Sequence, residues 1–115
     1  MRARPGKEVD SRMDDASSFE FTGTIWLWRP AKPSATGWHF LTVEGQIAAE
    51  IRYAALGRTG GFGSIRVTAI IGDTSWQTSL FPHRGTGGLL LPLKAEVRRR
   101  EGIAAGCDVT VLLTV

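Results

Sequence analysis

Hydrophobic and polar residues alternate along much of the chain, and the clearest alternation spans residues 64–81. Two runs rich in β-branched and aromatic residues, 64–71 and 74–81, flank the dipeptide Gly72-Asp73. A two-residue loop that begins with glycine is typical of the turn that joins neighbouring strands in an antiparallel hairpin. Apolar side chains fall on one side of both runs, so we expect the hairpin to present one mainly apolar face to a core.

The same period of two predicts the other strands of the chain. With the two strands of the hairpin they make six, the further ones covering residues 19–29, 38–43, 89–93 and 108–115. The strand over 38–43 is expected to pair with the first strand across a loop rich in proline and glycine.

Helical spacing replaces the alternation in two short segments, 44–56 and 94–101. In the first segment Ile47 and Ile51 lie one turn apart, and Gly57 can end the helix. In the second, Gly102 is placed to act as the C-terminal cap. The sequence therefore predicts two short helices.

These elements predict a mainly β fold with two short helices. Six short strands at regular intervals favour a small closed β-barrel, because closure removes the exposed strand edges that promote aggregation. Residues 1–18 lack hydrophobic periodicity and mix proline, glycine, serine and both charge signs, so we expect a disordered tail followed by a single domain over 19–115.

Several ordered motifs add a family resemblance to this prediction. They are Gly-Trp-His-Phe-Leu-Thr-Val at 37–43, Phe-Gly-Ser-Ile-Arg-Val-Thr-Ala-Ile-Ile-Gly from 62, Trp-Gln-Thr-Ser-Leu-Phe-Pro from 76, Leu-Leu-Pro-Leu-Lys at 90–94, Val-Arg-Arg-Arg-Glu-Gly-Ile at 97–103 and Gly-Cys-Asp-Val-Thr-Val at 106–111. Together they resemble the family known as domain of unknown function 1905. The resemblance implies a double-split β-barrel, the architecture of transcription regulators of the AbrB and MazE kind. It implies no reaction and no catalytic residues.

Composition and charge narrow the classes of partner only slightly. The net charge of the 115 residues is +3, and none of it comes from residues 1–18, which hold four basic and four acidic residues. The tail is therefore not a basic arm for nucleic acid. No apolar run is long enough to span a bilayer, and Cys107 is the only cysteine, so we expect a cytoplasmic protein without disulfides or membrane contact.

Residues suited to catalysis are few. His39 and His83 are the two histidines, and neither stands at the spacing of a metal motif or beside a nucleophile motif. His39 is expected to be a packed, hydrogen-bonded residue of the strand over 38–43, and Cys107 a small apolar residue at the start of a strand. We therefore expect no enzymatic activity, no cofactor and no metal.

Two groups of residues are candidates for ligand binding. Trp26 and Trp28 lie on the same side of the first strand and can form a stacking platform for an aromatic ligand, unless a closed barrel or the tail buries them. His83, Arg84, Lys94 and Arg98 can form an anion-binding corner if the loop after residue 82 folds back on the second helix. By contrast, Trp38 and Trp76 are expected to be core residues.

The other arginines beside Arg98 are expected to be solvated. Three consecutive helical residues point in directions about 100° apart, so residues 98–100 cannot form one basic face. Glu96 can pair with Arg99 or Arg100, and Glu101 with Arg98.

The sequence thus favours a non-catalytic β-barrel that binds a small molecule or a protein, through an anionic or aromatic group of that ligand. The alternative is a nucleic-acid-binding regulatory module, suggested by the analogy of fold alone. An enzyme ranks third. The chain supplies enough strands for a whole barrel, so a monomer is slightly favoured.

Overall fold

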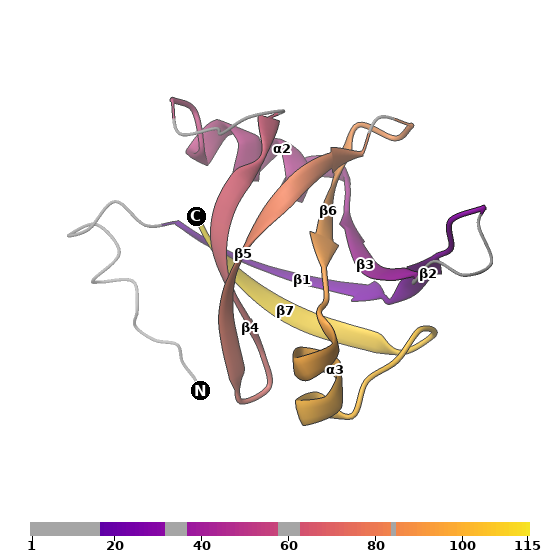
Figure 1. Ribbon diagram of the computed structural model, residues 1–115. Coiled ribbons are helices and arrows are strands. Elements are labelled where there is room, and N and C mark those ends of the chain that lie inside the picture. The colour runs from indigo at the N-terminus through magenta and orange to yellow at the C-terminus, as the bar shows by residue number, and fades with distance from the viewer. Residues whose placement is uncertain (1–16, 32–36, 58–62, 84) are drawn as a thin grey trace.

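The computed structural model describes residues 17–31, 37–57, 63–83 and 85–115 (Figure 1). In chain order the elements are β1 (Ser18–Thr24), β2 (Trp26–Trp28), β3 (Trp38–Val43), α2 (Gly45–Ala54), β4 (Ile65–Ile71), β5 (Thr74–His83), β6 (Gly88–Pro92), α3 (Ala95–Glu101) and β7 (Asp108–Thr114). The predicted hairpin is confirmed, since Ile71 pairs with Thr74 across the Gly72-Asp73 turn. The two predicted helices are confirmed as well.

All seven described strands belong to one antiparallel sheet, in the order β1-β7-β4-β5-β6-β3-β2. The sheet curls on itself (Figure 1). β5 is the longest strand, and it pairs with β4 through Leu80 and then with β6 from Phe81 to His83. It therefore holds the two halves of the sheet together.

The expectation of a closed barrel of six strands is wrong, because the sheet is a curled half-barrel of seven strands. The predicted first strand is interrupted at Ile25, which accepts a hydrogen bond from Gly106 N (2.8 Å) and donates one to Cys107 O (2.9 Å). Before this residue β1 pairs with β7, and after it β2 pairs with β3. β1 and β2 thus stand at the two ends of the strand order, so the ladder does not close into a ring.

The core lies on the concave side of this sheet and follows the predicted alternation. On β4 the residues Ile65, Val67, Ala69 and Ile71 are all buried. On the other strands the buried apolar residues likewise occupy every second position, as Leu41 and Val43, Leu89 and Leu91, and Val109, Val111 and Leu113 do. Alternate positions on the same strands are left for the outer face.

The two helices lie at opposite ends of the curled sheet (Figure 1). α2 buries Ala48 and Ile51, and Arg52 Nη2 donates a hydrogen bond to Gly88 O (3.1 Å) at the start of β6. α3 buries Val97. As predicted, α3 ends at Gly102 with a left-handed φ of 66°, and Ile103 N donates to Arg98 O (3.0 Å).

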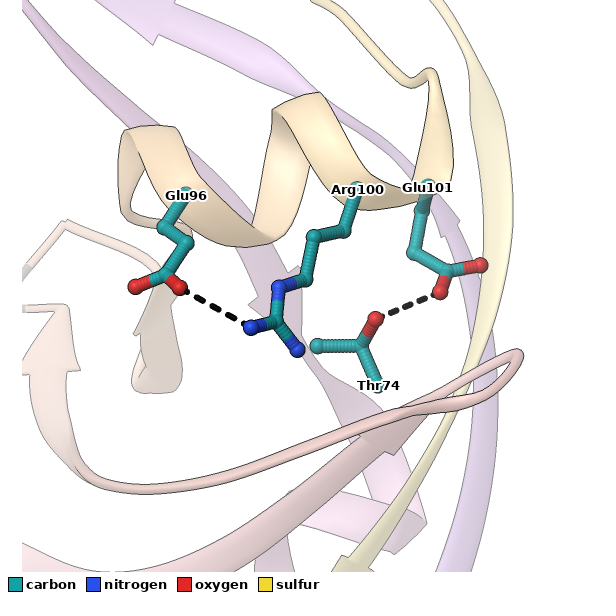
Figure 2. A network of polar contacts seen from close by, with 4 residues as sticks. All are labelled: Thr74, Glu96, Arg100 and Glu101. Carbon is teal, nitrogen blue, oxygen red and sulfur yellow. Dashed lines mark hydrogen bonds and ion pairs between the residues drawn. The ribbon is translucent and has the colours of Figure 1, made fainter.

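Polar contacts attach the end of α3 to the central hairpin (Figure 2). Thr74 Oγ1 donates a hydrogen bond to Glu101 Oε2 (2.5 Å), and Thr74 is buried. The predicted pairing of Glu96 with Arg100 is confirmed at 3.2 Å, but the expected contact between Glu101 and Arg98 is replaced by the bond to Thr74. Arg98 therefore forms no ion pair with a carboxylate of the described residues.

Two sequence predictions fall largely outside the described residues. The expected disordered tail overlaps them only at Ser17 and Ser18, the second of which begins β1. Arg84 lies in the gap between the last two described ranges. In the ranges that are described, neither helix has the length and apolarity needed to cross a membrane.

Candidate functional site

Aromatic side chains gather on the outer face of the half-sheet made by β2, β3, β6 and β5. Alternation places them there, because their strand neighbours Leu41, Leu89 and Leu91 point into the core. Cross-strand pairing aligns them, with Trp28 opposite Trp38 and Trp26 opposite Phe40. They line a pocket of about 460 Å³, which we call the aromatic pocket, together with other residues of these strands: Trp26, Trp28, Trp38, Phe40, Phe81, His83, Leu90 and Pro92.

The rings of the aromatic pocket are held in a fixed arrangement. Trp38 and Phe40 are stacked, with ring centroids 6.2 Å apart and an interplanar angle of 11°. Trp26 packs against Phe40 at 5.4 Å with a tilt of 41°, and its Nε1 donates a hydrogen bond to Thr42 Oγ1 (2.8 Å). Trp26 is thus fixed at its polar end as well as its ring face.

Three of the rings remain open to solvent. The exposed fractions are 47% for Trp28, 56% for Trp38 and 43% for Phe81. Clustered exposed aromatics of this kind are costly to hydrate and are typical of binding surfaces rather than of ordinary protein surface.

Among the described residues that line the aromatic pocket, His83 is the one titratable residue. Its ring centroid lies 6.3 Å from that of Trp26. On its other side, Nδ1 is 3.1 Å from Thr86 Oγ1, which accepts a hydrogen bond from Gly88 N (3.1 Å). The turn between β5 and β6 thus sets the orientation of the imidazole at the rim of the pocket.

A second, smaller pocket adjoins the first. It has a volume of about 180 Å³, and we call it the His39 pocket; it shares Trp38 and Pro92 with the aromatic pocket. Its polar and charged lining consists of His39, Gln77, Thr78, Lys94 and Arg98. None of the described residues that line it is acidic.

His39 is held in this pocket without a partner for one of its nitrogens. Its Nδ1 is buried and forms no hydrogen bond with the described residues, so the expected hydrogen bond is missing at this nitrogen. Burial, followed by the positive charges of Arg98 and Arg29, lowers the pKa of His39 below its ordinary value of 6.5. The imidazole is therefore neutral at pH 7 in the free protein.

Backbone contacts hold Arg98 close to this histidine. Leu93 N donates a hydrogen bond to His39 O (2.9 Å), and Arg98 Nε donates to Leu93 O (3.1 Å). Leu93 therefore connects β3 to α3 at the pocket.

The structure regroups the residues that the sequence singled out. Trp26 and Trp28 lie together and are joined by His83, whereas Lys94 and Arg98 line the His39 pocket. Arg84 belongs to the residues that are not described. Of the expected grouping, His83 is thus separated from Lys94 and Arg98, which line the adjoining pocket.

Sequence reasoning missed Trp38, Phe40 and Phe81. Trp38 was expected in the core, yet more than half of it is exposed. The signal is present in the sequence, because alternation puts Trp38 and Phe40 on the side of β3 opposite to the buried Leu41. The expectation for Trp76 is confirmed, since only 8% of its surface is exposed.

Other reactive groups do not form a site in the described residues. Cys107 is a free thiol packed against the core just before β7, as expected. Within the same ranges, no cluster of three His, Cys, Asp or Glu residues is placed to hold a metal ion.

Comparison with known proteins agrees with the motifs. By its fold, this protein is a curled antiparallel half-barrel, and its candidate site is an open aromatic pocket. The family model described as Domain of unknown function (DUF1905) matches residues 21–113, so the chain belongs to this family. No curated protein matches the chain.

Proposed function

We propose that this protein is a non-catalytic binding domain that receives a planar ring of a small molecule in the aromatic pocket. The observation that carries the proposal is the set of exposed rings, Trp28, Trp38 and Phe81, around a space of about 460 Å³. A space of this size suits a small ligand, for which typical pockets measure roughly 300–1,000 Å³.

The chemistry of the lining favours binding over catalysis. His83 is the only acid–base group among the described lining residues, and no nucleophile accompanies it. Covalent and acid–base catalysis generally require a reactive group with a positioned partner. The aromatic faces instead supply stacking and the exclusion of water.

The affinity for a simple planar compound should be modest. A neutral probe such as quinoline-6-carboxamide has about 13 heavy atoms, which at ~0.3 kcal/mol per atom gives roughly 4 kcal/mol, a millimolar Kd. This range is well suited to measurement by nuclear magnetic resonance.

The test is a titration with quinoline-6-carboxamide, followed through the indole N–H signals of the four tryptophans. We expect saturable shifts for Trp28 and Trp38 and little change for the buried Trp76. Trp28→Ala and Trp38→Ala should each weaken binding several-fold, whereas Tyr53→Ala should not, because Tyr53 is an exposed aromatic residue (77%) outside this pocket. Absence of any saturable shift at Trp28 and Trp38 would refute the proposal.

Two other outcomes would indicate a different function for the aromatic pocket. Retardation of a single-stranded oligonucleotide that weakens steeply with salt would favour the nucleic-acid module; the described lining of the aromatic pocket contains no Arg or Lys to support this. A dimer that forms with concentration and protects Trp28 from an aqueous quencher would instead make the pocket a contact between copies.

A further inference from the structure

We propose that the His39 pocket binds an oxyanion, so that the ligand of this protein is a planar aromatic molecule carrying a carboxylate or phosphate group. This inference rests on the proposed function and specifies the class of ligand. It is carried by the position of the His39 pocket beside the aromatic pocket and by the charges that converge on it.

The positive charges around the His39 pocket lack a described acidic counterpart. Lys94 and Arg98 both line it, and the charge of Arg29 also acts on His39. Glu101, the carboxylate expected to neutralise Arg98, is engaged by Thr74 instead. A guanidinium beside an ammonium, with no carboxylate in the lining, is a favourable environment for an oxyanion.

The buried Nδ1 of His39 is the second, independent observation. A buried polar atom without a hydrogen bond is costly, because it has lost water without gaining a replacement. Because this atom is fully buried in the free protein, a bound carboxylate or phosphate oxygen would accept a hydrogen bond from Nδ1–H only after a shift of the neighbouring side chains. The side chains of Gln77 and Thr78 offer further polar groups in the same lining.

The two pockets meet at the two residues that they share. Trp38 and Pro92 line each of them, and Trp38 is the most exposed of the pocket tryptophans. The ring of a ligand stacked on Trp38 would therefore lie beside the His39 pocket. The volume of about 180 Å³ accommodates a single carboxylate or phosphate group.

The test compares the neutral amide with two anionic analogues that carry the same ring, quinoline-6-carboxylate and quinolin-6-yl phosphate. We expect at least one anion to bind about tenfold more tightly than quinoline-6-carboxamide at low salt, and this advantage to shrink as salt is added. The better of the two identifies the preferred oxyanion. Equal affinity for all three compounds would overturn the inference while leaving the proposed function intact. If none of the three compounds binds, both this inference and the proposed function are refuted.

Charge-removing variants locate the anion. Arg98→Gln and Lys94→Gln should abolish most of the preference for the anion and leave the affinity for the amide unchanged. Arg100→Gln is the matched control, because it removes the same charge from α3 at a residue paired with Glu96 and outside the pocket. Lys94 is exposed and its side chain forms no hydrogen bond among the described residues, so its variant stays informative if Arg98→Gln unfolds. An unchanged preference in Lys94→Gln and in folded Arg98→Gln would refute the assignment.

Protonation gives a readout that a purely structural role would not produce. The cations that act on His39 are Arg98 and Arg29, Lys94 lines the same pocket, and a bound anion would offset their charge. The complex should then take up a proton on His39, so the affinity for quinoline-6-carboxylate, whose own charge does not change over this range, should rise as pH falls from 8 towards 6. His39→Gln should remove this pH dependence. A wild-type affinity that does not change over this range would contradict the role of His39.

Discussion

At the scale of single residues, what separates the core from the candidate site is the side of the strand on which a residue falls. Trp28 and Trp76 have the same side chain, yet 47% of the first is exposed and only 8% of the second. The two residues should therefore contribute very different amounts to the free energy of unfolding.

Replacing these tryptophans tests this separation. Trp76→Ala should lower the free energy of unfolding by about 3–5 kcal/mol, the usual cost of deleting a core aromatic ring. Trp28→Ala should change it by less than about 1 kcal/mol, because Trp28 lies on the outer face and about half of it is exposed to solvent. Urea denaturation monitored by circular dichroism measures both. A loss of similar size in the two variants would place Trp28 in the core.

The depressed pKa of His39 predicts a pH-dependent stability. The unfolded chain takes up a proton near the ordinary pKa of 6.5, whereas the folded protein does so only at lower pH. Stability from this residue is therefore fully present above about pH 6.5 and is lost as the pH falls towards the folded-state pKa.

The measurement is the unfolding free energy at several pH values between 8 and 5, in the wild type and in His39→Gln. We expect the variant to lose less stability on acidification than the wild type does. Parallel curves for the wild type and His39→Gln would show that His39 titrates alike in both states.

At the scale of elements, the contact between the central hairpin and α3 depends on a glycine. Gly72 has a φ of 57°, and a Cβ added there would overlap the Glu101 carboxylate that accepts the hydrogen bond from Thr74. The turn thus needs glycine both for its backbone conformation and for the close approach of α3.

Gly72→Ala should therefore cost more than Gly102→Ala. Both impose a left-handed conformation on alanine, at about 1–2 kcal/mol, but the space around Gly102 is open. Displacement of Glu101 should add about 1–3 kcal/mol in Gly72→Ala through the lost hydrogen bond. In a Glu101→Ala background the two alanine substitutions should have nearly equal costs in thermal or urea unfolding. If Gly72→Ala still costs more than Gly102→Ala in the Glu101→Ala background, the extra cost comes from the backbone of the turn and not from Glu101.

Most elements could be predicted from the sequence because each depends on a local pattern. The hairpin, β3, both helices and the cap at Gly102 follow from alternation, helical spacing and turn residues. The interruption at Ile25 could not be predicted, because the alternation from Phe21 to Leu27 is continuous in the sequence. Only the long-range hydrogen bonds of Ile25 to Gly106 and Cys107 reveal that the strand changes neighbours there.

The candidate site was only half predictable for the same reason. Trp26 and Trp28 are two positions apart on one strand, so their common side can be read directly. Phe81 and His83 join them through the pairing of β5 with β6 and of β6 with β3, which no local pattern specifies. The separation of Lys94 and Arg98 from His83 likewise depends on where α3 packs.

At the scale of the whole molecule, β5 ties the core of one half of the sheet to the aromatic pocket of the other. Trp76 lies in the part that pairs with β4, and Phe81 in the part that pairs with β6. One continuous strand in both halves favours a single cooperative unit.

Unfolding in urea should accordingly be a single transition. We expect the backbone amide signals of Leu113 in β7 and Leu91 in β6 to disappear with the same midpoint, and tryptophan fluorescence to follow them. Two separate midpoints would indicate that the halves unfold independently and that β5 does not couple them.

The alternation on β2, β3 and β5 has a practical consequence for protein engineering. Positions 28, 38 and 81 can be randomised in a combinatorial library without altering a single interior side chain, because each faces away from the hydrophobic centre. The half-barrel can in this way serve as a scaffold whose recognition properties are selected separately from its folding.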